Sequence, residues 1–515
     1  MERREGARRA GQGALREDAG PRGMNAALPR RSRGRVVGAG VGLAVALAGV
    51  TLPSAPAFAS GYLVARFGGD HGTPASPNPF AVYFNPAAMG GTQGTNLTLD
   101  VAPILRFVEY TRGADALGNP TLADPNNRSP EAERYRQANT GKASLTNVLA
   151  LGFLGLTTDL GLKTPLRFGY AAYVPFGGLA QWDKRTDPIA SDPLAPGAQD
   201  GVQRWHNING KILSIYNTLA MSYTVEPLRL SFGANVSLAL HEIDTVRARN
   251  IPDNGDEIQA FDGRFNEGRT RLVAHGFNVG AAFGVYWEPL ADRSIKLGVS
   301  YTSSPGFGRM RLDGDLTAQA GSNPETAEPS KVQLLQTYPD IVRFGGGWRL
   351  SKHWELRSDF EVVRWSMFDR QCVVAPGAEC NINPDGSSPN AVDIVLNIPR
   401  NFKDSFGARI GGAYFVNPDL ELFGSVAGTT SAIPPARMDA SAIDANRLYV
   451  SAGARYVFSE HFALAGSANW IHFFQVDTKG TARTDRLLNP SRSPSANGVY
   501  TSEIFVLNLN GTYTF

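Results

Sequence analysis

From residue 93 to the C-terminus, apolar and polar residues alternate with a period of two in one segment after another. One face of each segment is apolar and the other is polar or small, which is the pattern of a half-buried β-strand. Three clear examples have apolar or small residues at Leu97, Leu99, Val101, Leu105 and Phe107; at Leu166, Phe168, Tyr170, Ala172 and Val174; and at Phe505, Leu507, Leu509, Gly511, Tyr513 and Phe515. The pattern predicts an all-β fold for residues 93–515.

The connections between these segments alternate strictly between short and long. Six short turns lie at 161–164, 225–227, 289–293, 351–353, 417–419 and 459–460, and seven long loops rich in Pro, Asp, Asn and Ser lie at about 111–143, 177–204, 248–268, 318–330, 373–390, 428–446 and 477–498. Together they separate fourteen strands. Short turns at one end and long loops at the other are typical of an outer-membrane barrel. Only a closed barrel pairs every backbone group of a membrane-spanning sheet. We therefore predict a 14-stranded antiparallel transmembrane β-barrel.

The N-terminus predicts export. Four arginines between Arg30 and Arg35 precede an uncharged run, Val36 to Leu52, and Ala57-Phe58-Ala59 follows with small residues at its ends. Charged, apolar and small-residue regions in this order indicate a secretory signal peptide. We expect residues 1–59 to be removed before Ser60, with Met1 or Met24 as the start. The alternative is a membrane anchor, which needs about 20 apolar residues, whereas the run from Val36 to Leu52 has 17.

Residues 60–92 are too short for a domain and too apolar for a free tail, so we place them inside the barrel lumen as a hatch. They contain Asn85-Pro86-Ala87. Proline fixes the backbone, and Asn can cap its own turn through its side chain, which favours a compact element. The alternative is a simple turn leading into the first strand.

Composition excludes several classes of protein. The net charge is +3, which indicates neither nucleic-acid binding nor an acidic tail. Gly is abundant, with 56 residues, and charged residues make up 19% of the chain, as suits strands and turns. Seven scattered His residues show no H-E-x-x-H, so we expect no metal and no cofactor. Cys372 and Cys380 lie close together in one long loop, and an oxidising compartment favours a disulfide between them.

Five motifs in order and spacing resemble the FadL/TodX family of outer-membrane transporters for long-chain fatty acids and aromatic hydrocarbons. They are NPA at Asn85–Ala87, VPFGGLAQW at Val174–Trp182, WELRSDFEVVRWSMF at Trp354–Phe368, DSFGARIGGAY at Asp404–Tyr414, and LYVSAGARYVFSEHFALAGSANW at Leu448–Trp470. The resemblance implies a 14-strand barrel whose N-terminal hatch blocks the lumen. It also implies capture of cargo at the outer loops, binding in an apolar interior pocket and sideways release into the membrane.

Sideways release needs a gap in the barrel wall. Pro175 removes a ladder hydrogen bond from the third strand, and Gly177-Gly178 permit a bend. In the family a kink in the third strand makes the lateral opening, which implies an opening at Val174, Pro175, Phe176, Gly177 and Gly178. The alternative is that Pro175 ends the strand at the outer rim.

A fatty acid also needs a cation for its carboxylate, because an unpaired buried charge is costly. Candidates on strands are Arg106, Arg167, Lys211, Arg343 and Arg409. The alternative for each is a solvated or interfacial charge. Pattern alone does not show which of them face the lumen.

We therefore expect a monomeric channel in the bacterial outer membrane for passive uptake of long-chain fatty acids, surrounded by outer-membrane lipid. Phe515 would serve as part of the signal to the barrel assembly machinery. Alternatives are uptake of aromatic or aliphatic hydrocarbons by the same route, a general diffusion porin, a hydrolase with a lipid-facing Ser–His pair, and an adhesin. The apolar hatch argues against a porin, and the loops lack the repeats of an adhesin.

Overall fold

The computed structural model describes residues 66–250, 267–320, 327–481, 490–491 and 494–515. The predicted signal peptide, residues 1–59, and the first six residues of the predicted hatch lie outside the described residues. Among those described, no helix has both the length and the apolar character needed to cross a membrane.

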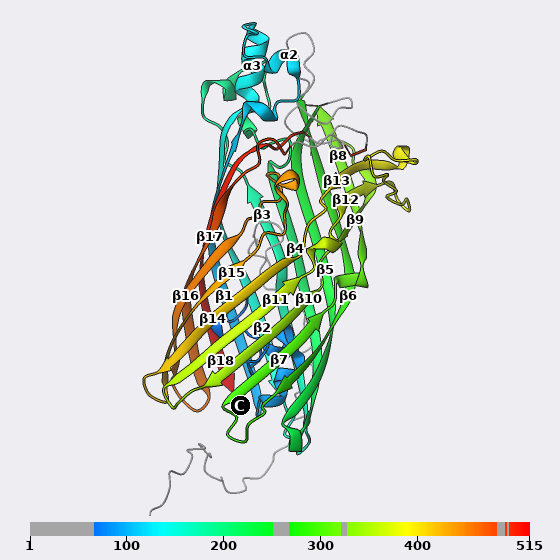
Figure 1. Cartoon of the computed structure of the whole chain (residues 1–515). Coiled ribbons are helices and arrows are strands. Elements are labelled where there is room, and N and C mark those ends of the chain that lie inside the picture. Colours follow the sequence, from blue (N-terminus) through cyan, green and yellow to red (C-terminus); the bar gives the residue numbers. More distant parts are fainter. Residues whose placement is uncertain (1–65, 251–266, 321–326, 482–489, 492–493) are drawn as a thin grey trace, which may run out of the picture. The chain divides into compact units, whose positions relative to one another are not determined.

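The strands form one antiparallel sheet that closes on itself, because β1 pairs with both β2 and β18 (Figure 1). Their bounds are β1 Thr95–Arg112, β2 Gly141–Thr158, β3 Leu166–Gln181, β4 Asn209–Val225, β5 Leu230–Asn250, β6 Glu267–Trp287, β7 Ile295–Thr302, β8 Arg309–Ala320, β9 Ser330–Thr337, β10 Ile341–Arg349, β11 Trp354–Val363, β12 Arg370–Val374, β13 Ile394–Pro399, β14 Ser405–Phe415, β15 Leu420–Thr429, β16 Arg447–Val457, β17 Phe462–Asp477 and β18 Gly498–Thr514.

Four consecutive barrel strands are each interrupted and so appear as two pieces: β7 with β8, β9 with β10, β11 with β12, and β13 with β14. Counting each pair as one strand gives the predicted fourteen, and the 14-strand antiparallel barrel is confirmed. The interruptions themselves were not predicted. Two had a readable signal in Pro305 and Pro339, which cannot donate to the ladder. The break after Val363 contains no proline, so the sequence carries no such signal there.

The helices are short and lie in the N-terminal segment and the loops. They are α1 Ala81–Phe84, α2 Pro120–Ala123 and α3 Pro130–Asn139, with 3₁₀ turns η1 Gly69–His71, η2 Pro86–Gly91, η3 Ala114–Ala116, η4 Pro188–Ser191, η5 Ala198–Asp200, η6 Glu226–Leu228, η7 Pro305–Phe307, η9 Trp365–Met367, η10 Ala391–Asp393 and η11 Pro435–Arg437. Helices α2 and α3 belong to the long loop between β1 and β2 (Figure 1).

The outer face of the barrel carries an apolar band. On β1 the exposed side chains from Leu97 to Phe107 are apolar, and the band ends where Glu109 pairs with Lys142 of β2. Its length matches the roughly 9–11 residues that a strand needs to cross hydrocarbon. Ion pairs beyond the band, such as Lys211–Glu242 and Arg271–Asp244, show that the strands continue into water.

Tryptophans follow this band only in part. Trp287, Trp348, Trp354 and Trp470 are exposed on the outer face, as an aromatic girdle requires. Trp182, Trp205 and Trp365 are buried instead, so these three do not belong to the girdle. They lie just after β3, before β4 and in the interruption after β11, where a position near a strand end does not fix the direction of the side chain.

Candidate functional site

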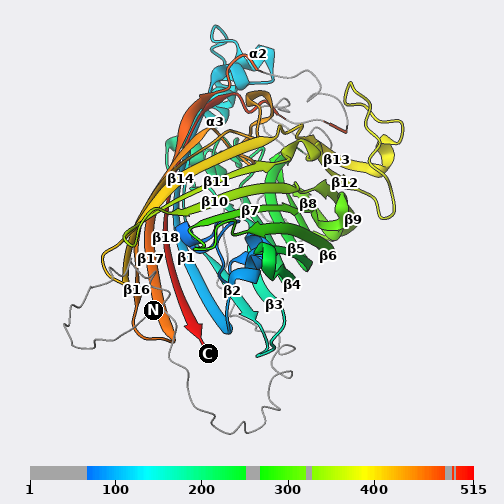
Figure 2. The same ribbon diagram turned by 60° about the horizontal axis from the view of Figure 1, so that its bottom comes forward.

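The N-terminal segment, Arg66–Thr92, lies inside the barrel (Figure 2). Its apolar side chains are almost completely buried: Phe67, Tyr83 and Met89 are no more than 3% exposed. Phe67 and Tyr83 pack against Tyr173 of β3, with ring centroids 5.6 and 5.0 Å apart. The segment therefore occupies the lumen as a packed element.

Glycines of the surrounding strands make room for the segment. They are Gly169, Gly233, Gly284, Gly298 and Gly345, from β3, β5, β6, β7 and β10. A Cβ atom on Gly284 would lie 1.9 Å from Asn85 Oδ1, and one on Gly298 would lie 2.0 Å from the carbonyl oxygen of Pro74. On this side, the backbone of the wall contacts the segment directly.

Both polar atoms of the Asn85 side-chain amide form hydrogen bonds. Its Oδ1 accepts a hydrogen bond of 3.1 Å from the backbone N–H of Ala87, which caps η2. Its Nδ2 donates to the carbonyl of Pro74 at 2.8 Å and to that of Val285 on β6 at 3.0 Å. Asn85-Pro86-Ala87 thus forms a self-capped turn tied to the wall. That the segment acts as a hatch stays a prediction.

Ion pairs hold the opposite side of the segment. Arg409 of β14 binds Asp70 of the segment at 2.7 Å and Asp359 of β11 at 2.6 Å. Arg66 binds the same Asp359 at 2.9 Å, and Ser425 donates to Asp70 at 2.6 Å. Arg409, one of the candidate carboxylate partners, is thus already compensated by two protein carboxylates.

A cavity of about 110 Å³, here called the inner cavity, adjoins the segment. The segment contributes Arg66, Phe67 and Phe84 to its lining. The apolar part of the wall comes from Ala102, Ile104, Leu151, Ala427, Ile471 and Val506, and the charged part from Arg343, Glu361, Arg409 and Arg447. The cavity thus combines an apolar wall with charged groups at its margin.

The remaining candidate cations differ sharply in their surroundings. Arg343 donates to the Tyr83 hydroxyl at 2.8 Å and lies 3.7 Å from Glu361. Arg167 donates to the backbone carbonyls of Thr92, Thr164 and Leu166. Lys211 pairs with Glu242 on the outer face of the barrel, so the expectation that it could face the lumen is wrong. The apolar residues on both faces of β4 had left its orientation open.

Arg106 differs from the other candidate cations in that it is buried without an ion pair among the described residues. It lies on β1 between Ile104 and Val108, both buried in the lumen, and is itself 3% exposed. In the part of the chain that the structure describes, its side chain forms no ion pair and its Nε has no hydrogen-bond partner. Ile104, which lines the inner cavity, is two residues and so about 7 Å away along the strand.

The hydrogen-bond ladder between β2 and β3 stops partway along the strands. Pairing runs from Thr158↔Phe168 to Phe153↔Tyr173 and goes no further. At the same point β3 shifts register against β4, with Val174 and Pro175 bulging between Tyr173 and Phe176. Side-chain contact resumes where Asn147 donates to the carbonyl of Leu179 at 2.8 Å.

The unpaired stretch lies at the level of the apolar band. Val148 of β2, beside the gap, is 70% exposed on the outer face, and Leu151 of the same strand lines the inner cavity. A Cβ atom on Gly177 would lie 3.2 Å from Val174 and 3.9 Å from Leu151, so side chains of β2 and β3 approach each other here. Val174–Gly178 thus lie where the ladder between β2 and β3 is unpaired.

A second cavity, about 100 Å³ and here called the outer cavity, lies nearer the long loops. Its wall is mainly aliphatic: Leu179, Ile212, Ile243, Leu272, Leu316, Leu334, Val373, Val395, Leu396 and Ile398. Arg400, from the interruption after β13, lines its margin and binds Asp439 at 2.9 Å and Gln371 at 2.7 Å. Asp439 belongs to the long loop between β15 and β16, so this contact holds that loop against the cavity.

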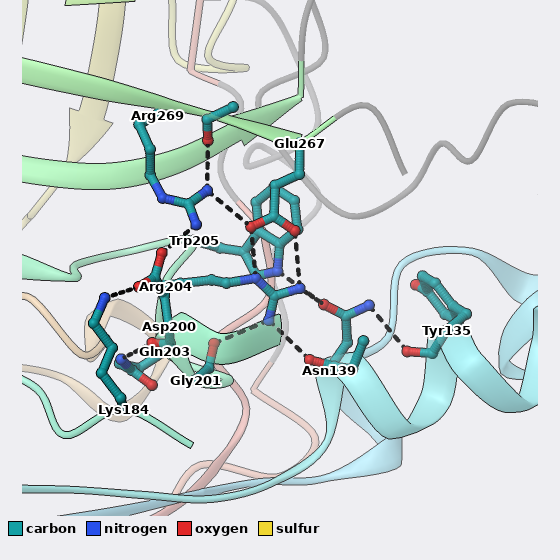
Figure 3. Close-up of polar contacts among 12 residues, drawn as sticks. Tyr135, Asn139, Lys184, Asp200, Gly201, Gln203, Arg204, Trp205, Glu267 and Arg269 are labelled. Atoms are coloured by element: carbon teal, nitrogen blue, oxygen red, sulfur yellow. Dashed lines mark hydrogen bonds and ion pairs between the residues drawn. The ribbon is translucent and has the colours of Figure 1, made fainter. Parts of the chain in front are cut away.

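A buried network of polar side chains fastens the loops that follow β1 and β3 to the start of β6 (Figure 3). Arg204 is 1% exposed and binds Glu267 at the start of β6 at 2.8 Å. It also donates to Asn139 Oδ1 at the end of α3 at 2.9 Å, as does the indole of Trp205. Arg269 adds ion pairs to Glu267 and Asp200. These contacts join two long loops to β6. The network, here called the latch, consists of Asn139, Asp200, Arg204, Trp205, Glu267 and Arg269.

Cys372 and Cys380 form a disulfide in the structure. In the described ranges, no cluster of His, Cys, Asp or Glu has the arrangement of a metal site. Ser214 and His241, on adjacent strands, lie 2.9 Å apart through Oγ and Nδ1. Both are buried on the lumen side rather than lipid-facing, and His241 Nε2 has no carboxylate partner among the described residues.

Comparison with known proteins agrees with this geometry. The family model "Outer membrane protein transport protein (OMPP1/FadL/TodX)" matches residues 57–515. Among solved structures, a Pseudomonas aeruginosa FadL homologue has 18% identity and a TM-score of 0.67, covering 89% of this chain and 100% of its own. The Pseudomonas putida toluene transporter TodX has 15% identity and a TM-score of 0.55, covering 89% and 98%.

The Ralstonia pickettii toluene transporter TbuX has 14% identity and a TM-score of 0.54, covering 85% of this chain and 94% of its own. These identities are low, so the three structures support the fold alone. No curated protein sequence matches the chain.

Proposed function

The chain belongs to the OMPP1/FadL/TodX family of outer-membrane transporters for hydrophobic molecules, and from this premise we propose that its cargo is a long-chain fatty acid, taken up passively. The protein lies in the bacterial outer membrane, crossing it with its fourteen strands. Family membership alone leaves fatty acids and hydrocarbons equally open as cargo.

The observation that carries the choice of a fatty acid is Arg106. A buried cation without a partner is costly, and a carboxylate is the natural ligand to compensate it. Arg106 does not itself line the inner cavity but lies two residues along β1 from Ile104, which does, so an acid could bind the guanidinium while its chain lies along Ile104 and Leu151. A neutral hydrocarbon would leave the charge uncompensated.

The route we propose has three stages. Cargo binds first in the aliphatic outer cavity, then in the inner cavity, and leaves sideways through the unpaired stretch of β2 and β3 at Val174–Gly178. Transfer of each methylene group from water contributes about 0.8 kcal/mol, so binding needs no energy source. The N-terminal segment acts as a hatch that stays packed below the route.

The second candidate is uptake of aromatic or aliphatic hydrocarbons by the same three stages. The aliphatic lining of the outer cavity favours it as much as it favours an acyl chain. A general porin is supported less well, because the packed segment Arg66–Thr92 occupies part of the lumen. We propose no catalysis. Working as a monomer, and assembly through Phe515, remain part of the proposal.

The test is uptake of labelled palmitate by cells that lack their own transporter, with and without this protein in the outer membrane. Saturable uptake is expected only when the protein is present. A labelled monoaromatic hydrocarbon serves as the competing cargo. Uptake of the hydrocarbon without palmitate, by a barrel shown to be folded, would replace the first candidate with the second.

A further inference from the structure

Six buried aromatic side chains form a layer across the lumen, here called the aromatic layer: Phe176, Tyr216, Tyr338, Trp365, Phe368 and Phe402. Each is 5% exposed or less. Phe176 stacks on Tyr338 with ring centroids 4.9 Å apart and meets Trp365 edge-on at 6.3 Å. Phe402 contacts Trp365 at 6.0 Å and Phe368 at 5.0 Å. The rings therefore form a continuous contact from β3 to the far wall.

The interrupted strands supply four of the six rings. Tyr338 lies between β9 and β10, Trp365 and Phe368 between β11 and β12, and Phe402 between β13 and β14. In a regular strand, successive side chains point to opposite faces, which limits how many bulky groups can meet in the lumen at one level. Because the chain leaves strand geometry at these points, it can direct these rings inward together.

The layer lies between the two cavities. Along the β9–β10 strand, Leu334 lines the outer cavity, Tyr338 belongs to the layer and Arg343 lines the inner cavity. The same order recurs with Val373, Trp365 and Glu361 on the next strand, and with Leu396, Phe402 and Arg409 on the one after. No residue of the layer lines either cavity.

We propose that the aromatic layer is the selectivity barrier between the two cavities, admitting cargo of narrow cross-section and excluding branched or polycyclic cargo. The inference rests on the proposed function, because it concerns the passage of that cargo. Most of the surface of these rings is apolar, and Tyr216, Tyr338 and Trp365 carry only one polar group each, so the same layer offers polar solutes few hydrogen bonds. An unbranched acyl chain can pass between rings that rotate aside, whereas a branched chain needs several rings displaced at once.

Two fatty acids with the same head group test this: palmitate, which is unbranched, and phytanate, its tetramethyl-branched relative. Cells carrying the wild-type protein are expected to take up palmitate in clear preference. Trp365→Ala removes the largest ring of the layer and should raise the ratio of phytanate to palmitate uptake on the order of tenfold, which corresponds to about 1.4 kcal/mol of barrier. Phe368→Ala should shift the ratio in the same direction.

The matched control is Trp354→Ala, because Trp354 is 54% exposed on the outer face and far along the strand from the layer. It should leave the ratio unchanged. If Trp365→Ala does not fold, as judged by heat-modifiable migration on gels, Trp365→Leu serves the same purpose with a smaller loss of volume.

The inference is overturned if folded Trp365 and Phe368 variants keep the wild-type ratio, or if the wild type takes up both acids equally. Either result leaves the proposed function standing. Uptake of neither acid by folded wild-type protein overturns the proposed function and the barrier with it.

Discussion

At the scale of single residues, the ion-pair partners of a buried arginine distinguish a structural role from a proposed role in binding cargo. Arg409 and Arg106 look alike in the sequence, since each is an arginine on an alternating strand. The structure gives Arg409 two carboxylates and gives Arg106 none among the described residues. The partners of Arg409 come from residues 70 and 359, so no local pattern could have revealed them. By contrast, the self-capped turn at Asn85 could be predicted, because its cap is local.

Replacing Arg106 with methionine tests the role proposed for its charge. A hydrogen bond to a charged group contributes about 1.5–3 kcal/mol, so the apparent affinity for palmitate should fall roughly 10- to 150-fold. Uptake of the methyl ester of palmitate should not fall, because it carries no charge. Arg106→Lys, which keeps the charge, should recover part of the loss. Equal effects on acid and ester would contradict a carboxylate site.

At the scale of elements, the third strand shows which irregularities of a strand can be predicted from its own sequence and which cannot. Pro175 and the two following glycines predicted an irregularity in β3, and the structure has a bulge there. The end of the β2–β3 ladder depends on how two strands align, which neither sequence shows alone. Likewise, two prolines marked interruptions, but only the sheet shows that four adjacent strands break together.

Deleting Pro175 tests whether the bulge makes the exit. The deletion restores one-to-one pairing of β3 with β4, so β3 should straighten and the exit should narrow. Palmitate uptake is expected to fall to near background, while binding of palmitate to purified protein, measured by calorimetry, persists. Pro175→Ala keeps the residue count of the bulge and is the control. Normal uptake after the deletion would place the exit elsewhere.

At the scale of the whole molecule, alternating turn and loop lengths were enough to predict a closed barrel of fourteen strands, because they reflect the two sides of a membrane. The cavities and the latch could not be predicted. They depend on side chains from loops distant in sequence, such as Asn139, Arg204 and Glu267, meeting at one point.

Replacing Arg204 with methionine tests the latch. It leaves Glu267 without its buried bidentate partner, and breaking a buried ion pair costs about 3–5 kcal/mol. Because the network joins loops rather than barrel strands, limited proteolysis should cut the loops at 113–140 and 182–208 faster, while the barrel stays folded. Lys142→Met, which breaks an ion pair that is more than half exposed, should change little, at about 0–1 kcal/mol. Equal protection in both variants would show that the latch is not needed.

The position of the N-terminal segment has a consequence for the cell. The segment packs against glycines of the wall on one side and ion pairs on the other, and the proposed exit through the wall never requires it to move. Uptake could then proceed while the barrel stays sealed from end to end. A cell could keep many copies of such a channel in its outer membrane without losing small solutes or admitting polar toxins.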